Sequence, residues 1–555
     1  MHRILPLAFT CLVTACVLAA CGATTPKPVP DASATAPPLF ENFGGLHRDI
    51  GTPIPATQRY FDQGLRMAYG FNHAAATRAF AEAARLDPNC AMCWWGQALV
   101  LGPNINLPMD PALAAEATAL STRAVALSAH AKPADRALID ALRLRYATPA
   151  PQARAALDLA YATAMGKAAE QFPDDDDIAT LYAEALMDLT PWAYWTAQGQ
   201  QTEYTPRILA ALDRVLARNP QHIGAMHYYI HATEASPDPG RAERYADSLA
   251  AQAPGSGHLV HMPAHTYIRL GRYHDATLSN FAAADADNAF LAICRGSNGV
   301  YPLGYVPHNW HFATMSAGLT GSRVLALQAA AQTAKRADRA TMGSPGLEFM
   351  QLFVVAPLLT HVRFGDWDAV LAEPVPAPEL PFPLAIRHFA RGLAQVRGGN
   401  LNAATQEAQA LHAIAADAAM ARLNFGSNSA DSILRVADAL LRGELLRAQG
   451  HKAPALTALR EAASAEDALK YNEPADWPLP VRWYLGAALL ESGDPAAAAQ
   501  AYRENLKTYP ENGWALFGLV QAQRALGDAA GATISERRQA TAWQWADAPL
   551  TASRY

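Results

Sequence analysis

The sequence predicts an all-α protein, a solenoid of stacked helix pairs. A repeat is the first reason: His227 and His231 recur as His261 and His265, each 34 positions further on, and periods of roughly 20–50 residues are typical of repeat architectures. Composition is the second, because hydrophobic residues make up 51% of the chain, charged residues 17%, and alanine is frequent, which suits closely packed helices. The third is that no run alternates apolar and polar residues for long enough to indicate a sheet.

Two stretches show the repeat most clearly. In frame 57–90 large and small residues fall at positions 4, 8, 20, 24, 27 and 32, and these are Tyr60, Gly64, Ala76, Phe80, Ala83 and Pro88. In frame 479–512 the matching residues are Gly486, Gly493, Ala498, Tyr502 and Pro510. This pattern resembles the tetratricopeptide repeat, a helix–turn–helix unit of about 34 residues. One unit cannot bury its apolar face alone, so neighbouring units stack into a solenoid.

The N-terminus has the pattern of an export signal. Arg3 precedes an apolar run, 4–20, that is short for a permanent membrane helix. The run ends in Leu18-Ala19-Ala20-Cys21-Gly22, which resembles a bacterial lipobox and implies cleavage before Cys21 and lipidation of that residue. On this resemblance, Gly22 in place of aspartate implies an outer-membrane protein that faces the periplasm and meets the membrane only through its lipid. An ordinary secretory signal is the alternative.

Composition shifts divide the chain into segments. Residues 1–20 are predicted to be the lipoprotein signal, and residues 21–50, which are rich in Pro, Thr and Ala at their start, a flexible tether. An N-terminal repeat array is predicted over 51–373 and a C-terminal array over 384–555. The two arrays are joined by the Pro-rich break 374–383, PVPAPELPFP.

Histidines gather in frames 223–256 and 257–290 and after the insertion 291–307. In tetratricopeptide domains, positions 2, 5, 9 and 12 of the first helix commonly line the concave groove. At such positions this chain has His227, His231, Glu234, His258, His261, His265, His308 and His311. The resemblance therefore implies a histidine-lined concave groove that binds a peptide, a partner protein or a small ligand.

The spacing of the histidines also predicts a transition-metal site. Residues four apart on a helix lie about 6 Å apart along its axis and about 40° apart around it, so His227 with His231, or His261 with His265, can face one ion. Neighbouring helices pack about 8–10 Å apart, a gap that two inward imidazoles can span to a shared ion with bonds of about 2 Å. Imidazole suits zinc, copper and iron. The alternatives are hydrogen bonds between His and nearby Tyr side chains, or an anionic or peptide ligand.

Pro263 interrupts the first helix of frame 257–290, between His261 and His265. A proline inside a helix removes a backbone hydrogen bond and clashes with the preceding turn, and such a break can aim the two side chains. In the second interpretation the helix starts at Pro263, where proline is tolerated. His258 and His261 then lie in a loop, and the pairing weakens.

Acidic and sulfur-bearing side chains offer two weaker candidates. Glu184 and Asp188 can add a carboxylate from the preceding helix, and the alternative for them is ordinary helix surface and core. Cys90 and Cys93 form a C-x-x-C motif, for which three interpretations stay open: a disulfide, inert thiols, or a redox or metal site. Trp94 in place of histidine excludes attachment of a c-type haem.

Longer stretches carry a more specific resemblance. The chain is similar to exported bacterial tetratricopeptide-repeat lipoproteins that have H-x-x-x-H motifs. The stretches that carry this similarity are FNH, DPNCAMCWWG, GPNIN, HYYIHATEAS, GHLVHMPAHTYIRLGRY and YVPHNWHF. This likeness implies the fold but no reaction. The sequence has no G-x-S-x-G, P-loop or Rossmann motif, and it has no basic stripe, so nucleic acid is not an expected partner.

Three functions follow from these patterns. The first is an envelope scaffold that binds its ligand in the histidine-lined groove, with a bound metal ion as an addition. The second is a metal-dependent enzyme in which Glu234 is a ligand or general base. The third is a structural assembly factor of the outer membrane, for which the chemistry of the groove is incidental.

Overall fold

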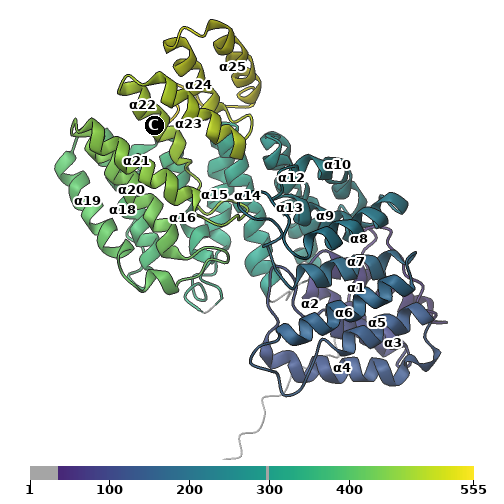
Figure 1. The fold of residues 1–555 in the computed structure, drawn as a ribbon. Coiled ribbons are helices and arrows are strands. Elements are labelled where there is room, and N and C mark those ends of the chain that lie inside the picture. The colour runs from purple at the N-terminus through teal and green to yellow at the C-terminus, as the bar shows by residue number, and fades with distance from the viewer. Residues whose placement is uncertain (1–35, 295–298, 345) are drawn as a thin grey trace, which may run out of the picture. The chain divides into compact units, whose positions relative to one another are not determined.

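Antiparallel helix pairs build this protein. The structure is a computed structural model that describes residues 36–294, 299–344 and 346–555. Within those ranges the chain is all-α, with helices packed on their neighbours in sequence and no β-strand (Figure 1). The predicted fold class, a helical-repeat solenoid of the tetratricopeptide type, is confirmed.

The helices follow one another along the chain, joined by short turns and by longer loops such as 188–204. The first part of the chain contains α1 Pro55–Tyr69, α2 His73–Leu86, α3 Ala91–Leu99, α4 Ala114–Leu127, α5 Pro133–Arg143, α6 Ala155–Gln171, α7 Asp176–Met187, α8 Thr205–Arg218, α9 Ile223–Thr233, α10 Glu243–Gln252, α11 Gly257–His261, α12 Pro263–Arg269 and α13 Tyr273–Ile293. The second part contains α14 Val306–Leu319, α15 Arg323–Arg336, α16 Met350–Phe364, α17 Trp367–Ala372, α18 Pro381–Arg397, α19 Leu401–Ala415, α20 Ala430–Ala448, α21 Lys452–Asp467, α22 Val481–Glu491, α23 Pro495–Thr508, α24 Gly513–Ala525 and α25 Ala529–Ala542.

Glycines on the first helices of the repeats make room for one large side chain. Phe80 on α2 is fully buried between Gly64 on α1 and Gly96 on α3. A Cβ atom at these glycines would lie 2.6 Å and 2.4 Å, respectively, from the Phe80 ring, closer than carbon atoms can approach without strain. These contacts explain why the repeat has a small residue at position 8 and a large residue at position 24.

The same packing recurs in the C-terminal array, where a Cβ at Gly518 would lie 2.1 Å from the buried Tyr502 ring. We expect Gly518→Ala to lower the free energy of unfolding by about 1–3 kcal/mol, because the added methyl overlaps this ring. In an open helix the same change stabilises by roughly 0.5–1 kcal/mol. Gly240→Ala is the control, since its Cβ would meet neighbours at 3.6 Å. Urea denaturation measures both, and a Gly518→Ala chain as stable as wild type would contradict this account.

Residues 38–50 pack against the helices. Phe43 is 3% exposed, and the buried Arg48 forms an ion pair of 2.7 Å with Asp135. The predicted flexible tether over 21–50 therefore extends too far along the chain. Its last part carries aromatic and charged side chains with partners in the helical body, which the Pro- and Thr-rich composition of its first part concealed.

The two interruptions of the repeat differ in structure. Non-helical residues 373–380 separate α17 from α18, so the last three residues of the predicted break, 374–383, already belong to α18. In the insertion 291–307, a π-helical turn over Tyr301–Tyr305 leads directly into α14. Both segments belong to one compact unit, Pro38–Tyr555.

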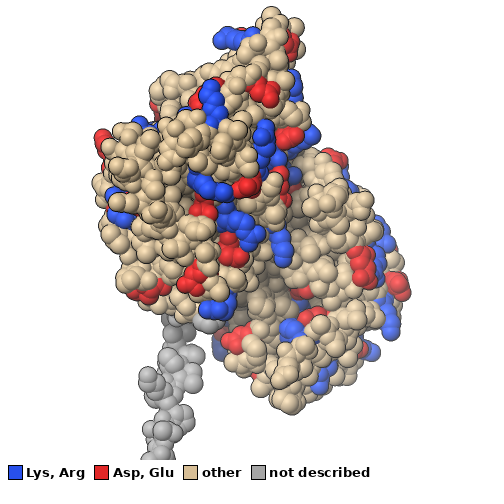
Figure 2. All heavy atoms as spheres, turned by 60° about the vertical axis from the view of Figure 1, so that its left-hand side comes forward, with Lys and Arg blue, Asp and Glu red and all other residues tan. Residues whose placement is uncertain are grey.

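Charges are mixed on the surface. On the face drawn in Figure 2, basic and acidic side chains lie interspersed among uncharged ones. Among the described residues, no helix combines the length and apolar character needed to cross a bilayer. The predicted signal, 1–20, and the predicted lipidation site, Cys21, lie outside the described residues.

Candidate metal centre

Three helical layers bring the histidines together. His227 and His231 lie on α9, His258 on α11, His261 at its last residue, and His265 on α12. Gly224 allows α9 to approach α1 closely, because a Cβ at this position would lie 2.4 Å from the Tyr69 ring of α1. The next layer, α14, supplies His308.

The structure combines the two interpretations of Pro263: the helix is interrupted between His261 and His265, as the first predicts, and a new helix begins at Pro263, as the second predicts. Pro263 is the first residue of α12, and Met262 before it keeps helical angles, φ −51° and ψ −35°. His258 and His261 nevertheless lie on a helix, because α11 forms a short turn of its own before the break. The two H-x-x-x-H motifs thus face the same interior region from neighbouring layers.

Six of the seven predicted histidines form two groups of three. His227, His231 and His258 are the first triad, and His261, His265 and His308 are the second triad; within each, one nitrogen per ring lies within 4.8 Å of the others. His311, the seventh, belongs to neither of these groups, and its ring packs at 5.5 Å against Phe353. It lies three residues after His308, about 60° away from it around α14, and its ring contacts Phe353 instead of the triads.

Hydrogen bonds fix the protonation of two of these rings. His227 Nδ1 lies 2.6 Å from the backbone carbonyl of Tyr69, and His261 Nδ1 lies 2.6 Å from Asn280 Oδ1. The Asn280 amide nitrogen donates to the Ala276 carbonyl at 2.7 Å, so its oxygen is the atom that faces His261. Both Nδ1 atoms must donate, and a neutral ring then has its lone pair on Nε2.

Glu234 fixes two more rings, one from each triad. His231 Nδ1 donates to Glu234 Oε1 at 2.7 Å, and His265 Nδ1 donates to Oε2 at 2.6 Å. Tyr471 donates its hydroxyl to Oε2 at 3.2 Å. Carboxylates that hold the outer nitrogen of a histidine in this way are typical partners of metal-binding imidazoles. The structure therefore gives Glu234 an orienting position between the triads.

The Nε2 atoms of His261 and His265 converge without a proton to share. His261 Nε2 and His265 Nε2 lie 2.8 Å apart, although both rings carry their proton on Nδ1. His231 Nε2 is buried and has no hydrogen-bond partner. Two nitrogens bound to one zinc ion are about 3.3 Å apart, so a rotation that moves the His261 and His265 nitrogens apart by about 0.5 Å would fit this pair to an ion.

Burial keeps these rings neutral. His227, His231 and His265 are at most 2% exposed, and loss of hydration lowers the pKa of each to about 3. A neutral imidazole is the form that binds metal, whereas a protonated one repels it. The rings are thus held in the metal-binding form at neutral pH and well below it.

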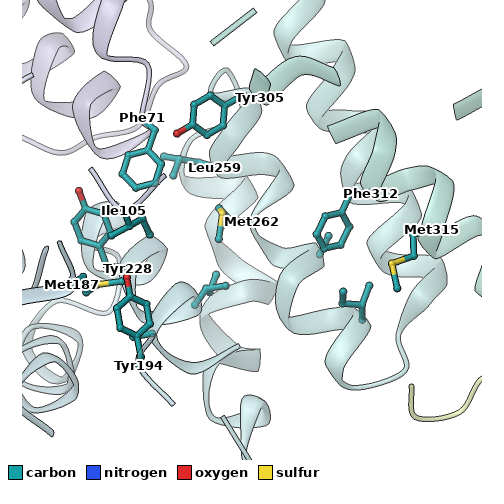
Figure 3. Close-up of a cluster of buried hydrophobic side chains, with 14 of the residues drawn as sticks. Phe71, Ile105, Met187, Tyr194, Tyr228, Leu259, Met262, Tyr305, Phe312 and Met315 are labelled. Carbon is teal, nitrogen blue, oxygen red and sulfur yellow. The ribbon is translucent and has the colours of Figure 1, made fainter. Parts of the chain in front are cut away.

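Aromatic side chains enclose the site, and this corrects one prediction. The sequence implied that the histidines line an open concave groove, but His227, His231, His258, His261 and His265 are at most 2% exposed. Figure 3 shows three of the aromatic side chains that lie beside them, Phe71, Tyr305 and Phe312. Each aromatic ring lies close to a histidine ring, as measured between ring centres. These distances are 4.5 Å for Phe71 and His227, 4.8 Å for Tyr305 and His258, and 4.8 Å for Phe312 and His265. One of these aromatic residues, Tyr305, comes from the insertion 291–307, which repeat periodicity does not describe.

The loop with the sequence GPNIN joins two parts of this cover. Asn106 donates to the Tyr305 hydroxyl at 3.2 Å and accepts from Trp192 Nε1 at the same distance. Trp192, with a left-handed φ of +64°, lies with its ring centre 5.2 Å from that of His231. A non-glycine residue in that conformation is strained, which points to a fixed role for the Trp192 side chain over the triads.

Glu184 and Asp188 do not join the histidines. Both face Arg145, which is 1% exposed; Asp188 contacts its guanidinium directly, and Glu184 lies 3.6 Å away. The Tyr161 ring covers the Arg145 guanidinium at 4.5 Å. Burial raises the pKa of both carboxyl groups. Glu184 and Asp188 therefore fit the alternative prediction, a position in the core, better than the role of metal ligand.

Sulfur atoms lie apart from the triads. Cys90 and Cys93 are joined by a disulfide at the start of α3, the first of the three interpretations that the motif left open. Among the described residues, Cys294 is a free thiol.

Comparisons with known proteins identify no family for this chain. No protein-family model and no curated protein matches this chain. Human IFIT1 in a dimer with m7Gppp-AAAA is 12% identical, with 89% of this chain and 91% of IFIT1 covered and a TM-score of 0.32. Yeast Tom70 is 10% identical, with 87% and 89% covered and a TM-score of 0.28. The tetratricopeptide domain of P58(IPK) is 12% identical, with 85% and 99% covered and a TM-score of 0.21.

Proposed function

We propose that this chain is a helical-repeat scaffold of the cell envelope that holds a transition-metal ion in the second triad. The contact between His261 and His265 carries the proposal. Their Nε2 atoms lie 2.8 Å apart, and each ring has its proton committed to an acceptor on the far side. Two lone pairs at this distance repel each other unless a cation lies close to both. Zinc, copper and iron all accept imidazole ligands.

Elemental analysis of the full chain, prepared without a polyhistidine tag, tests the proposal. We expect at least one equivalent of a transition metal per chain, either as purified or after incubation with zinc, copper and iron in turn. In the double variant His261→Ala/His265→Ala that equivalent is expected to be lost. His311→Ala is the matched control, because this histidine lies on α14 beside the site but outside both triads. A metal-free wild-type chain after all three incubations would refute the proposal.

A metal-dependent enzyme is the second candidate function. Three histidines leave a fourth position of a tetrahedral ion open for water or substrate, as in catalytic zinc sites. Cobalt(II) substitution tests this idea, because its visible spectrum changes when an added ligand such as azide enters the open position. An unchanged spectrum would favour a scaffold whose ion is structural.

The proposed place of the protein is the periplasmic side of the outer membrane, through a lipid on Cys21. The lipobox-like LAACG supports this. We expect Cys21→Ala to move the chain from the membrane fraction to the soluble fraction of the cell envelope, as measured by immunoblotting after fractionation. Wild type and Cys90→Ala are the controls, and both should stay with the membrane. If the Cys21→Ala chain also stays there, a lipid anchor at Cys21 is wrong.

Peptides, partner proteins or small ligands are proposed to bind the outer surface of the repeats. The histidines are enclosed by aromatic side chains, so a macromolecular ligand would meet the covering residues before the rings. Binding of such a partner is therefore expected to survive His261→Ala/His265→Ala, provided that the variant stays folded.

A further inference from the structure

We infer that the site holds two metal ions, one in each triad, and that both ions are copper. This inference rests on the proposed function and extends it from one ion to a linked pair. The first triad, His227, His231 and His258, is the second site. It has its own converging nitrogens and no histidine in common with the second triad, and the two triads share Glu234 as an orienting partner.

The first triad offers a cation three imidazoles of its own, although it shares Glu234 with the second triad. His227 Nδ1 is held by the Tyr69 carbonyl, which leaves its Nε2 to face His258 Nε2 at 3.0 Å. His231 Nδ1 is held by Glu234, and its Nε2 is buried with no partner. An unpartnered buried nitrogen loses its hydration without replacement. An ion bound by these three nitrogens would restore that lost interaction.

One ion cannot serve all six rings through short bonds. A four-coordinate ion with nitrogen bonds of about 2 Å accepts four ligands, and the six imidazoles separate into two sets of three. A further group joins His231, Glu234 and His265, but both rings meet that carboxylate through Nδ1 hydrogen bonds. Glu234 is therefore the link between two sites and not the centre of a third.

Charge and ligand type select copper. All six ligands of the two triads are imidazoles, and Glu234 is the carboxylate that contacts them. The cost of burying an ion rises with the square of its charge, so two Cu(I) ions are far easier to enclose here than two divalent ions. Iron and manganese sites in helical proteins draw on several carboxylates. Copper also leads the affinity order for nitrogen ligands among the divalent metals, so the site would retain the metal if it were oxidised.

Glu234 couples the two sites because its carboxylate accepts one proton donor from each. Glutamine at this position keeps the shape but offers one acceptor and one donor. Whichever imidazole faces the amide NH₂ must then move its proton to Nε2 and lose its metal-binding lone pair. We expect Glu234→Gln to weaken the binding of one of the two ions by about 10–100-fold.

Anaerobic titration of the metal-free full chain with Cu(I), against a coloured Cu(I) chelator, tests the pair. Wild type and the control His311→Asn are expected to bind two ions. His258→Asn, in the first triad, and His308→Asn, in the second, are each expected to bind one. Circular dichroism checks that the variants are folded, and X-ray absorption on the loaded wild type should show nitrogen neighbours only.

The outcomes separate this inference from the proposed function. No copper and no zinc on wild type would overturn both. One ion, lost in His308→Asn and kept in His258→Asn, would overturn the pair and leave a single metal site standing. Two zinc ions without Cu(I) binding would overturn the assignment of copper. Two Cu(I) ions on wild type support the pair even if a variant fails to fold.

Discussion

Saturation with its metal is expected to raise the free energy of unfolding of the wild-type chain by about 4 kcal/mol when free metal is at 1,000 times the dissociation constant. The reason is that the triads exist only in the folded chain, where hydrogen bonds hold four rings in one orientation. Unfolding scatters the ligands and releases the ion. Urea denaturation, followed by circular dichroism with metal present and after chelation, measures the difference.

His265→Ala is expected to lose most of this gain, because it removes a ligand and one of the donors to Glu234. His311→Ala is the control and should keep the gain, since His311 lies outside both triads. A metal-induced gain of equal size in both variants would show that the metal stabilises the chain from another place.

Arg145→Leu is expected to lower the free energy of unfolding by about 3–5 kcal/mol at pH 8, the range for removal of one partner from a buried ion pair. Arg145 is 1% exposed and faces both Glu184 and Asp188. Without the guanidinium, two carboxyl groups remain in the core with no cation. Arg214→Leu, a change at an exposed position on α8, is the control and should cost less than about 0.5 kcal/mol.

The loss in Arg145→Leu should shrink on acidification. Burial already raises the pKa of Glu184 and Asp188 in the wild type, so the folded chain binds protons at a pH where the unfolded chain does not. Stability contributed by such groups falls as pH rises between the unfolded and folded pKa values. Parallel urea titrations at pH 8 and pH 5.5 should therefore give a smaller difference between variant and wild type at pH 5.5. An equal or larger difference at pH 5.5 would contradict this explanation.

Repeat periodicity was enough to predict much of the architecture. The small residues at position 8 and the large residue at position 24 follow from contacts that recur in each unit, such as Gly64 with Phe80. The same reasoning placed His227, His231, His261 and His265 on adjoining layers, because a side chain repeated at the period of the fold keeps its direction. The residue sizes at these positions and the placement of the four histidines both depend on local helix geometry and on the stacking of neighbouring repeats. Both can therefore be predicted from short stretches of sequence.

The enclosure of the site could not be predicted in this way. Tyr305 lies in the insertion 291–307, where periodicity gives no positions, and Trp192 lies in the loop between α7 and α8, where the chain departs from the helix that the repeat predicts. Two hydrogen-bond partners of the site carry no sequence signal of their own. Asn280 accepts from His261 and lies one helix away, and Tyr471 donates to Glu234 from 237 residues downstream. His311 was predicted from a register extended across an insertion, and the ring of Phe353 on α16, which turns His311 away from the triads, lies outside that register.

The contact between Tyr471 and Glu234 has a consequence for the order of assembly. Every histidine of the triads lies between residues 227 and 308, so neighbouring repeats can form the site early, through contacts close in sequence. Tyr471 joins the site only when the chain between α21 and α22 docks, after a loop of 237 residues has closed, and contacts across such a loop form late. We therefore expect metal to enter a half-assembled protein quickly and to leave the finished one slowly. Its exchange rate would then report the opening of this docked segment more than the strength of the metal–nitrogen bonds.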